Sequence, residues 1–135
     1  AEAMRLDIGH RVHLPGHVER PAEAAALFDL FALSSDSEQF PLSVVEAMAA
    51  GLAVASPAVG DVADIVSAEN APFITPPGDE AALGEALLRL AKDETLRRRV
   101  GAANLLRARS EYDEAAMARQ HAALYAAALG LPSFP

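Results

Sequence analysis

The clearest structural signal in the chain is the run from Ser34 to Gly51, SSDSEQFPLSVVEAMAAG. Between Gln39 and Gly60 the one formally charged side chain is Glu46, and the rest are apolar, small or hydroxyl-bearing. Apolar side chains fall on most faces of this run, which is typical of a buried helix. Because an unpaired buried charge is costly, we expect Glu46 to have hydrogen-bond donors from the protein or from a ligand.

The start of this helix has a recognisable residue pattern. Pro41 suits the first helical position, where its fixed φ helps and its missing N–H does no harm. The free N–H groups that follow belong to Leu42, Ser43 and Val44. Together with the helix macrodipole, such groups bind phosphate or another anion. The sequence therefore predicts a ligand that carries phosphate.

Two carboxylates flank this helix end. Glu38 lies eight residues before Glu46, so the pair can contact one ligand at different points along its length. A purely structural interpretation is also open, because a Glu near a helix start favours the dipole in any protein. An Ala-rich run likewise forms a helix whatever it binds.

The same run resembles the signature of the retaining glycosyltransferases of family 4. Their donor-binding domain carries E-x7-E within a pattern close to P-S-x-x-E-G-F-G-x-x-x-x-E-A-M-A-x-G-x-P-V-V-A. The matching residues here are Ser35, Glu38, Phe40, Glu46 to Ala49, Gly51 and the strand-like 53–56. Further similarity covers 11–16, 58–66 and 72–90. The resemblance implies transfer of a sugar from a nucleotide-diphosphate sugar to a glycan, lipid or small-molecule acceptor, with retention and without a bound metal.

The resemblance also implies roles for individual residues. Glu38 is expected to contact hydroxyls of the transferred sugar and to stabilise positive character near its anomeric carbon. Glu46 is expected to accept hydrogen bonds from the ribose. The remaining residues expected to bind the donor are Phe40, Leu42, Ser43, Gly16 and Gly60. Gly16 would border the base, whereas Gly60 would let the backbone approach a phosphate or sugar.

Two of these expectations carry alternatives or departures. Gly60 also fits an ordinary turn that precedes a helix with Asp61 as its N-cap. Gln39 and Pro41 replace both glycines of the family's E-G-F-G element. Pro41 thereby removes one amide that would have been available to the phosphate or sugar.

Composition sets the limits of the fold and the partners. The chain has 135 residues, 52% of them hydrophobic, which is enough for one domain with a core. The net charge of −8 argues against nucleic acid, which requires a basic face. Cysteine is absent, which fits a cytoplasmic protein, with peripheral membrane attachment of the full-length parent as an alternative. No signal peptide or spanning run is recognised, and no metal-ligand spacing occurs, so neither metal nor cofactor is expected.

The order of elements predicts an α/β fold. Strands are expected at 11–16, 30–34, 52–56 and 72–77, alternating with helices that begin near Pro21, Pro41, Asp61 and Asp79. This alternation favours a Rossmann-like parallel sheet with helices on both faces. A further helix is expected at 94–109, and its arginines are expected to face solvent. A last helix is expected at 114–129, anchored by Met117, Leu124 and Tyr125. The resemblance makes residues 1–135 a single donor-binding domain from the C-terminal half of a GT-B fold.

The resemblance also predicts an incomplete domain. Relatives place two further βα units before the strand at residue 11, with a basic element that meets the donor pyrophosphate, and a separate acceptor domain. Near Glu38 to Gly60 this chain has no basic residue, so we expect weak donor binding and no turnover by the isolated chain. An exposed sheet edge is expected to favour a homodimer. A non-catalytic α/β module for nucleotide binding or dimerisation is the main alternative, and a flavodoxin-like phosphate-binding regulatory domain is the least supported.

Overall fold

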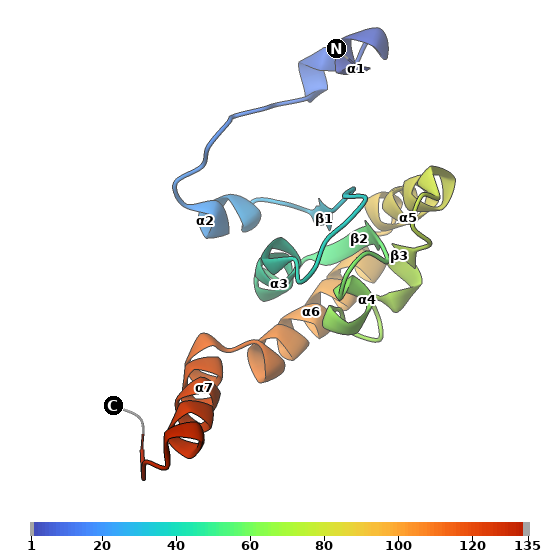
Figure 1. The fold of residues 1–135 in the computed structure, drawn as a ribbon. Coiled ribbons are helices and arrows are strands. Elements are labelled where there is room, and N and C mark those ends of the chain that lie inside the picture. Colours follow the sequence, from blue (N-terminus) through green and yellow to red (C-terminus); the bar gives the residue numbers. More distant parts are fainter. Residues whose placement is uncertain (1, 134–135) are drawn as a thin grey trace.

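A small parallel sheet lies at the centre of the molecule (Figure 1). The structure is a computed structural model, and it describes residues 2–133. The strands are β1 (Leu30–Ala32), β2 (Ala53–Pro57) and β3 (Ile74–Thr75), in the order β1-β2-β3. Phe31 lies opposite Val54 across the first pair, and Ser56 lies opposite Ile74 across the second. Three of the four expected strands are confirmed, and all of them run parallel.

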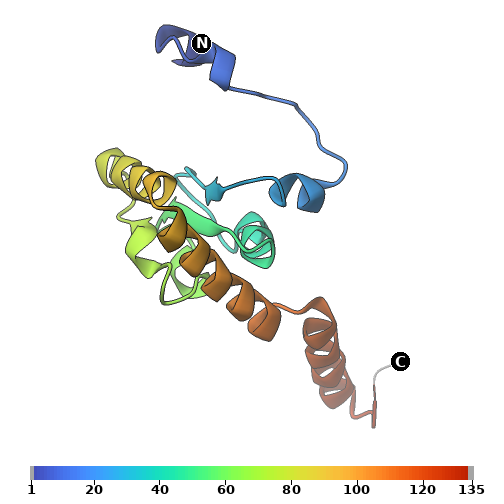
Figure 2. The same ribbon diagram turned by 180° about the vertical axis from the view of Figure 1, so that it is seen from behind.

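Helices cover both faces of this sheet (Figures 1 and 2). The described residues form helices α1 (Glu2–Arg5), α2 (Pro21–Ala25), α3 (Leu42–Ala49), α4 (Val62–Ile65), α5 (Glu80–Lys92), α6 (Glu94–Glu111) and α7 (Glu114–Leu129). Those that pack on the sheet are α3, α4, α5 and α6. Short 3-10 turns span Gly9–Arg11 and Ala71–Phe73. Across residues 2–133, no helix combines the length and the apolar character needed to cross a membrane.

The central strand β2 is buried on both faces, as the middle strand of a parallel sheet should be. Its side chains alternate between two apolar clusters. Val54 packs into the cluster formed with α3 and α4, whereas Ala53 and Ala55 pack into the cluster formed with α5. The expected Rossmann-like arrangement, with helices on both faces of a parallel sheet, is therefore confirmed.

Two buried asparagines complete the hydrogen bonding of β2. Asn70 Oδ1 accepts from the Val54 N–H (2.8 Å), and Asn70 Nδ2 donates to the Val54 carbonyl oxygen (2.8 Å). Asn104 of α6 donates to the Leu52 carbonyl oxygen and to Asn70 Oδ1 (both 2.9 Å), and it accepts from the Ser67 N–H (3.1 Å). The side chain of Asn70 thus takes the place of a neighbouring strand beside Val54, because β3 begins too late to pair there.

α6 packs along α3 in the opposite direction. At one end Gly101 of α6 lies against Gly51, the residue that follows α3. A Cβ at Gly101 would stand 2.0 Å from the Gly51 carbonyl oxygen, so only glycine fits there. At the other end Tyr112 lies beside Phe40, which precedes α3.

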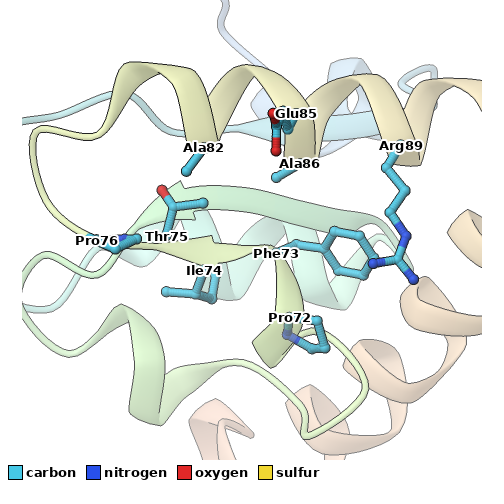
Figure 3. A pocket seen from close by; sticks show the side chains of 9 residues that line it. All are labelled: Pro72, Phe73, Ile74, Thr75, Pro76, Ala82, Glu85, Ala86 and Arg89. Atoms are coloured by element: carbon cyan, nitrogen blue, oxygen red, sulfur yellow. The ribbon is translucent and has the colours of Figure 1, made fainter.

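α5 covers the opposite face of the sheet beside the short strand β3. Asp79 Oδ1 accepts from the Ala82 N–H (2.9 Å), so the predicted N-cap of this helix is confirmed. A cavity of about 330 Å³ lies between α5 and β3 (Figure 3). Arg89 extends from α5 over the Phe73 ring, 5.3 Å from the ring centre. This arginine therefore covers the side of the α5 cluster.

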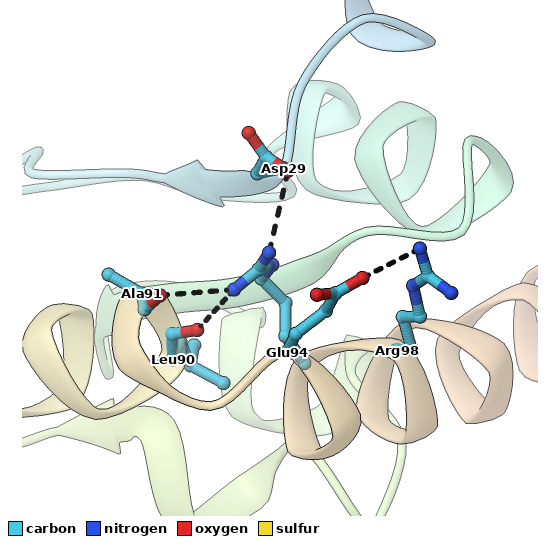
Figure 4. Close-up of polar contacts among 6 residues, drawn as sticks. Asp29, Leu90, Ala91, Glu94 and Arg98 are labelled. Carbon is cyan, nitrogen blue, oxygen red and sulfur yellow. Dashed lines mark hydrogen bonds and ion pairs between the residues drawn. The ribbon is translucent and has the colours of Figure 1, made fainter.

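The arginines of α6 do not all face solvent, contrary to the prediction. Arg97 donates to the carbonyl oxygens of Leu90 (2.9 Å) and Ala91 (3.2 Å), and it lies 3.4 Å from Asp29 (Figure 4). Arg107 donates in the same way to Ile65 and Asp64. Both arginines bind carbonyl groups at the ends of preceding helices, because those groups have no partner within their own helix.

The strand expected at 11–16 does not form. These residues are exposed and lie in an arm that leads away from the sheet to α1 (Figures 1 and 2). A strand needs a neighbour to accept its hydrogen bonds, and β1 lies at the edge of the sheet, where the described part of the chain places no strand on its outer side. The helix that begins at Pro21 is expected to continue to Asp29 with Leu27 as a packing residue, but α2 ends at Ala25 and leaves Leu27 84% exposed.

α7 projects from the end of α6 (Figures 1 and 2). Its expected anchors Met117, Leu124 and Tyr125 are between 51% and 66% exposed, so the prediction that they pack into the core is wrong. Ala126 is the one buried residue of this helix. The body of the fold does not extend far enough to cover the apolar side chains of α7.

Candidate functional site

The N-terminal end of α3 is open. Pro41 occupies the N-cap position, with φ −74° and ψ 101°, so the first helical residue is Leu42 rather than Pro41 as predicted. The Val44 N–H donates to the Pro41 carbonyl oxygen (3.0 Å), so this predicted free donor is in fact paired. Among the described residues, no partner accepts from the N–H groups of Leu42 and Ser43. Two backbone donors therefore remain available at this helix end.

Glu46 lies one turn into α3 on its exposed side, so the prediction of an all-round buried helix is wrong. The buried side of α3 carries Val44, Ala47 and Met48, which face β2 and α6. Within residues 2–133, no hydrogen bond or ion pair is formed by the Glu46 carboxylate. The carboxylate needs no protein donor because it stays in water. It is thus available to a ligand.

The loop that carries Glu38 is held against the loop after β2. The Asp61 N–H donates to the Gln39 carbonyl oxygen (2.8 Å). Gly60 has φ +52°, and a Cβ there would stand 2.2 Å from the Gln39 carbonyl oxygen and 2.7 Å from that of Glu38. Gly60 therefore permits a close approach of backbone to this chain's own loop, while its predicted contact with the donor stays a prediction. Asp61 is at the N-cap of α4 as expected, but its side chain makes no capping hydrogen bond.

Phe40 lies between the Glu38 loop and α3. Its side chain is 43% exposed. The other part of the ring meets Tyr112 edge-on, with 6.0 Å between ring centres and 63° between planes. No sequence pattern predicted a place for this tyrosine beside the site. The sequence does place Tyr112 directly before Asp113, a residue type that starts helices, so a break between two helices could have been predicted there. The structure bears this out, because the Asp113 carboxylate accepts from the Ala116 N–H (2.8 Å).

The carboxyl edge of the sheet is acidic. A cavity of about 210 Å³ there is lined by Ser34 and Asp36 of the β1–α3 loop, by Pro57, and by the α5 N-terminus at Gly78, Asp79, Glu80 and Leu83. Neither Glu38 nor Glu46 lines it. The sequence has no Lys, Arg or His between Arg20 and Arg89. Backbone N–H groups are therefore the positive partial charges that these loops and the α3 end can offer an anion.

The structure brings most of the predicted site residues together. Those at the carboxyl ends of β1 and β2 or at the adjoining helix end are Glu38, Phe40, Leu42, Ser43 and Gly60, with Glu46 one turn further along α3. Gly16 is not brought to this group, because it lies in the exposed arm with no atom within 4 Å of a Cβ built there. In the part of the chain that the structure describes, His, Asp and Glu residues form no group of three or more suited to a metal ion.

The fold and this gathering of loops define an α/β domain of Rossmann-like type whose open helix end lies at the carboxyl edge of a parallel sheet. The family model described as "Glycosyl transferases group 1" matches residues 1–93. The chain belongs to the group 1 glycosyltransferase family, and its architecture is that of part of a GT-B fold.

Individual relatives agree with this assignment. The chain is 32% identical over 96 residues to the N-acetyl-alpha-D-glucosaminyl L-malate synthase of Bacillus anthracis, a match over 71% of this chain and 25% of that protein. It is 39% identical over 98 residues to an exopolysaccharide phosphotransferase of Streptomyces coelicolor, over 71% of this chain and 10% of that protein. Among solved structures, sucrose-phosphate synthase from Thermosynechococcus elongatus superposes with a TM-score of 0.89 at 28% identity, covering 96% of this chain and 33% of that one.

The chain is short beside these relatives. It spans a quarter and a tenth of the length of the two curated proteins, and a third of the solved structure. The superposition covers nearly all of this chain, so most of the arm and of α7 is included in it. The arm and α7 therefore have counterparts in the larger structure of that sucrose-phosphate synthase.

Proposed function

We propose that this chain is the donor-binding domain of a retaining glycosyltransferase of family 4, acting in the cytoplasm on a nucleotide-diphosphate sugar. The observation that carries the proposal is the open end of α3, where the free N–H groups of Leu42 and Ser43 adjoin the Glu38 loop. Donors of this kind at a helix N-terminus, together with the dipole, suit a phosphate group. The family membership adds sugar transfer as the reaction in which such a site takes part.

The two carboxylates would act at different parts of the donor. Glu46 is open to solvent on the same side of α3 as Ser43, three residues earlier, and this position suits hydrogen bonds to ribose hydroxyls. Glu38 stands in the loop before the helix and would contact the transferred sugar, where its charge stabilises positive character at the anomeric carbon. The leaving diphosphate would be stabilised by the helix end. No step in this scheme calls for a metal.

Weak binding follows from the electrostatics of the site. Arg and Lys contacts to phosphate are shorter and stronger than neutral hydrogen bonds, and the segment that builds this site contains neither residue. The net charge of −8 adds a general repulsion of anions. We therefore propose that the isolated chain binds donor weakly, with a Kd of about 1 mM, and does not turn it over. Two further βα units of the donor-binding domain would supply the basic side chains, and a separate domain would supply the acceptor site.

The test is calorimetric titration at low salt with UDP, GDP and ADP and with UDP-glucose, GDP-mannose and ADP-glucose. We expect one nucleotide family to bind and Glu46→Ala to abolish that binding. Glu85→Ala is the matched control, because Glu85 is also an exposed helical glutamate but lines the distant cavity beneath α5. Loss of binding in Glu85→Ala with retention in Glu46→Ala would overturn the assignment of the site to α3.

A non-catalytic nucleotide-binding or dimerisation module is the second candidate. The lack of basic residues near the helix end favours it, since a working transferase must stabilise its leaving group. Turnover separates the two candidates. Chromatography measures whether the full-length parent releases sugar from the bound conjugate. Release supports the enzyme, whereas binding of the nucleotide without any release supports the module.

A further inference from the structure

The loop before α3 is held firmly on one side. The hydrogen bond from the Asp61 N–H and the close packing of Gly60 both act on the backbone of Glu38 and Gln39. These contacts fix the main chain from the direction of β2. They do not involve the ring of the following residue, Phe40.

Tyr112 is the group that meets Phe40 on the other side. The two rings pack edge to face with 6.0 Å between their centres, an arrangement that aromatic pairs favour. Tyr112 is half-buried and packs against the cluster that contains Val44 and Val54. Its N–H donates to the Ala108 carbonyl oxygen (2.9 Å), which fixes its backbone as the C-cap of α6.

The position of Tyr112 is set far from the site. α6 runs along α3, and the tight contact of Gly101 with Gly51 fixes the register of the two helices at the opposite end. Because α6 is a continuous helix between Gly101 and the residue before Tyr112, this register also determines where the Tyr112 ring stands. The ring is therefore a rigid support for the loop.

We propose that Tyr112 is a positioning residue for Glu38: its ring braces Phe40 and thereby completes the placement of the loop that presents the carboxylate to the transferred sugar. The consequence for the sugar rests on the proposed function, whereas the placement of the loop does not. A purely core-filling role for Tyr112 would instead make any apolar side chain of similar size an adequate substitute.

The first test follows backbone amide signals of the whole chain by NMR. In Tyr112→Leu, which keeps an apolar side chain but removes the ring, we expect the signals of residues 36–40 to shift or broaden. Signals of α5 around Leu90 should stay unchanged, and Tyr112→Phe should restore the loop. Unchanged loop signals in Tyr112→Leu would overturn the proposal. If Tyr112→Leu does not fold, Phe40→Leu removes the other ring from a partly exposed position and is judged by the same signals.

The second test compares two ligands that share a nucleotide. The affinities for UDP and UDP-glucose, or for the corresponding GDP or ADP pair if that pair binds, are measured by titration. We expect Tyr112→Leu to lower the affinity for the sugar conjugate about tenfold and to change the affinity for the nucleoside diphosphate less than about twofold. The affinities of Tyr112→Phe should stay close to those of the wild type. A general loss of stability would weaken both ligands alike.

The outcomes separate this inference from the proposed function. Binding of both ligands with an unchanged affinity ratio in Tyr112→Leu would leave the donor site standing and overturn the positioning role. Displaced loop signals in a chain that binds none of the nucleotides would support the positioning role and count against donor binding by this chain alone.

Discussion

At the scale of single residues, two uncharged residues, Asn70 and Gly60, hold the backbone that carries the site. Asn70 satisfies both the N–H and the carbonyl group of Val54 at the centre of β2. Gly60 allows the loops after β1 and β2 to touch through their backbones. Gly60 acts at the carboxyl edge of the sheet, where the predicted donor residues gather, whereas Asn70 holds the strand that leads to this edge.

Replacing Asn70 by Ala should destabilise the chain strongly. Two backbone groups of Val54 would be left buried without partners, and each such group costs about 1–3 kcal/mol. We expect the free energy of unfolding in urea to fall by about 3 kcal/mol. Ser110→Ala is the control, since it removes an exposed hydrogen bond and should change stability by less than about 0.5 kcal/mol. Equal effects of the two substitutions would contradict the strand-like role of Asn70.

Alanine substitutions at two glycines with positive φ distinguish the cost of backbone strain from the cost of steric crowding. Gly60→Ala and Gly78→Ala both place a Cβ on a left-handed residue, but a Cβ at Gly78 meets no atom within 4 Å. We expect Gly78→Ala to cost about 1 kcal/mol and Gly60→Ala to cost a further 1–3 kcal/mol or so, because the Gln39 carbonyl oxygen blocks the new methyl group. Urea unfolding measures both, and equal costs would show that the contact with Gln39 is unimportant.

At the scale of elements, the pairing of α3 with α6 determines the geometry of the site. Gly101 and Gly51 set the register at one end, and Phe40 meets Tyr112 at the other. Arg97 and Arg107 add further ties from α6 to the ends of α5 and α4. α6 therefore connects segments that lie far apart in the sequence.

Helical glycines on α5 and α6 should respond to alanine in opposite directions. Gly84 of α5 is open, so Gly84→Ala should stabilise the chain by up to about 1 kcal/mol through helix propensity. Gly101→Ala gains the same propensity but forces α6 away from the Gly51 carbonyl oxygen, and we expect a net loss of about 1–3 kcal/mol. Thermal unfolding decides the sign, and stabilisation by Gly101→Ala would refute the close contact.

At the scale of the whole molecule, much apolar surface lies outside the two core clusters. Leu14 in the arm, Leu27 after α2 and Leu124 on α7 are each more than 60% exposed. β1 is an edge strand, and in residues 2–133 no segment pairs with its outer side. An open edge of this kind is a template for another strand.

Self-association through β1 is the expected consequence. We predict a concentration-dependent dimer in sedimentation velocity, and we expect Ala32→Lys to abolish it, because a lysine on an edge strand opposes pairing. Ala32 is exposed at the end of β1. Ala81→Lys, at an exposed position of α5, adds the same charge and should leave the dimer intact. A dimer that survives Ala32→Lys would place the interface elsewhere.

The sequence by itself determined the elements whose local signals are strong. The helix after Pro41, the buried strand β2 and the Asp79 cap all follow from residue patterns within a few positions of each other, and the structure confirms them. β1 forms at the expected position, but it lies at the sheet edge and none of its residues is buried. The E-x7-E signature likewise led to the group 1 family. Local preferences suffice in these segments because propensity, capping and burial all agree.

Only the tertiary structure decided which segments pack and which side chains reach the site. Val12 and Leu14 have the pattern of a strand, but among the described residues no strand pairs with them. The face of Glu46 is exposed because no segment within residues 2–133 covers that side of α3. Tyr112, far along the chain from Glu38, comes to the same loop through the packing of α6 on α3. These outcomes depend on contacts between distant residues, and such contacts have no counterpart in local sequence periodicity.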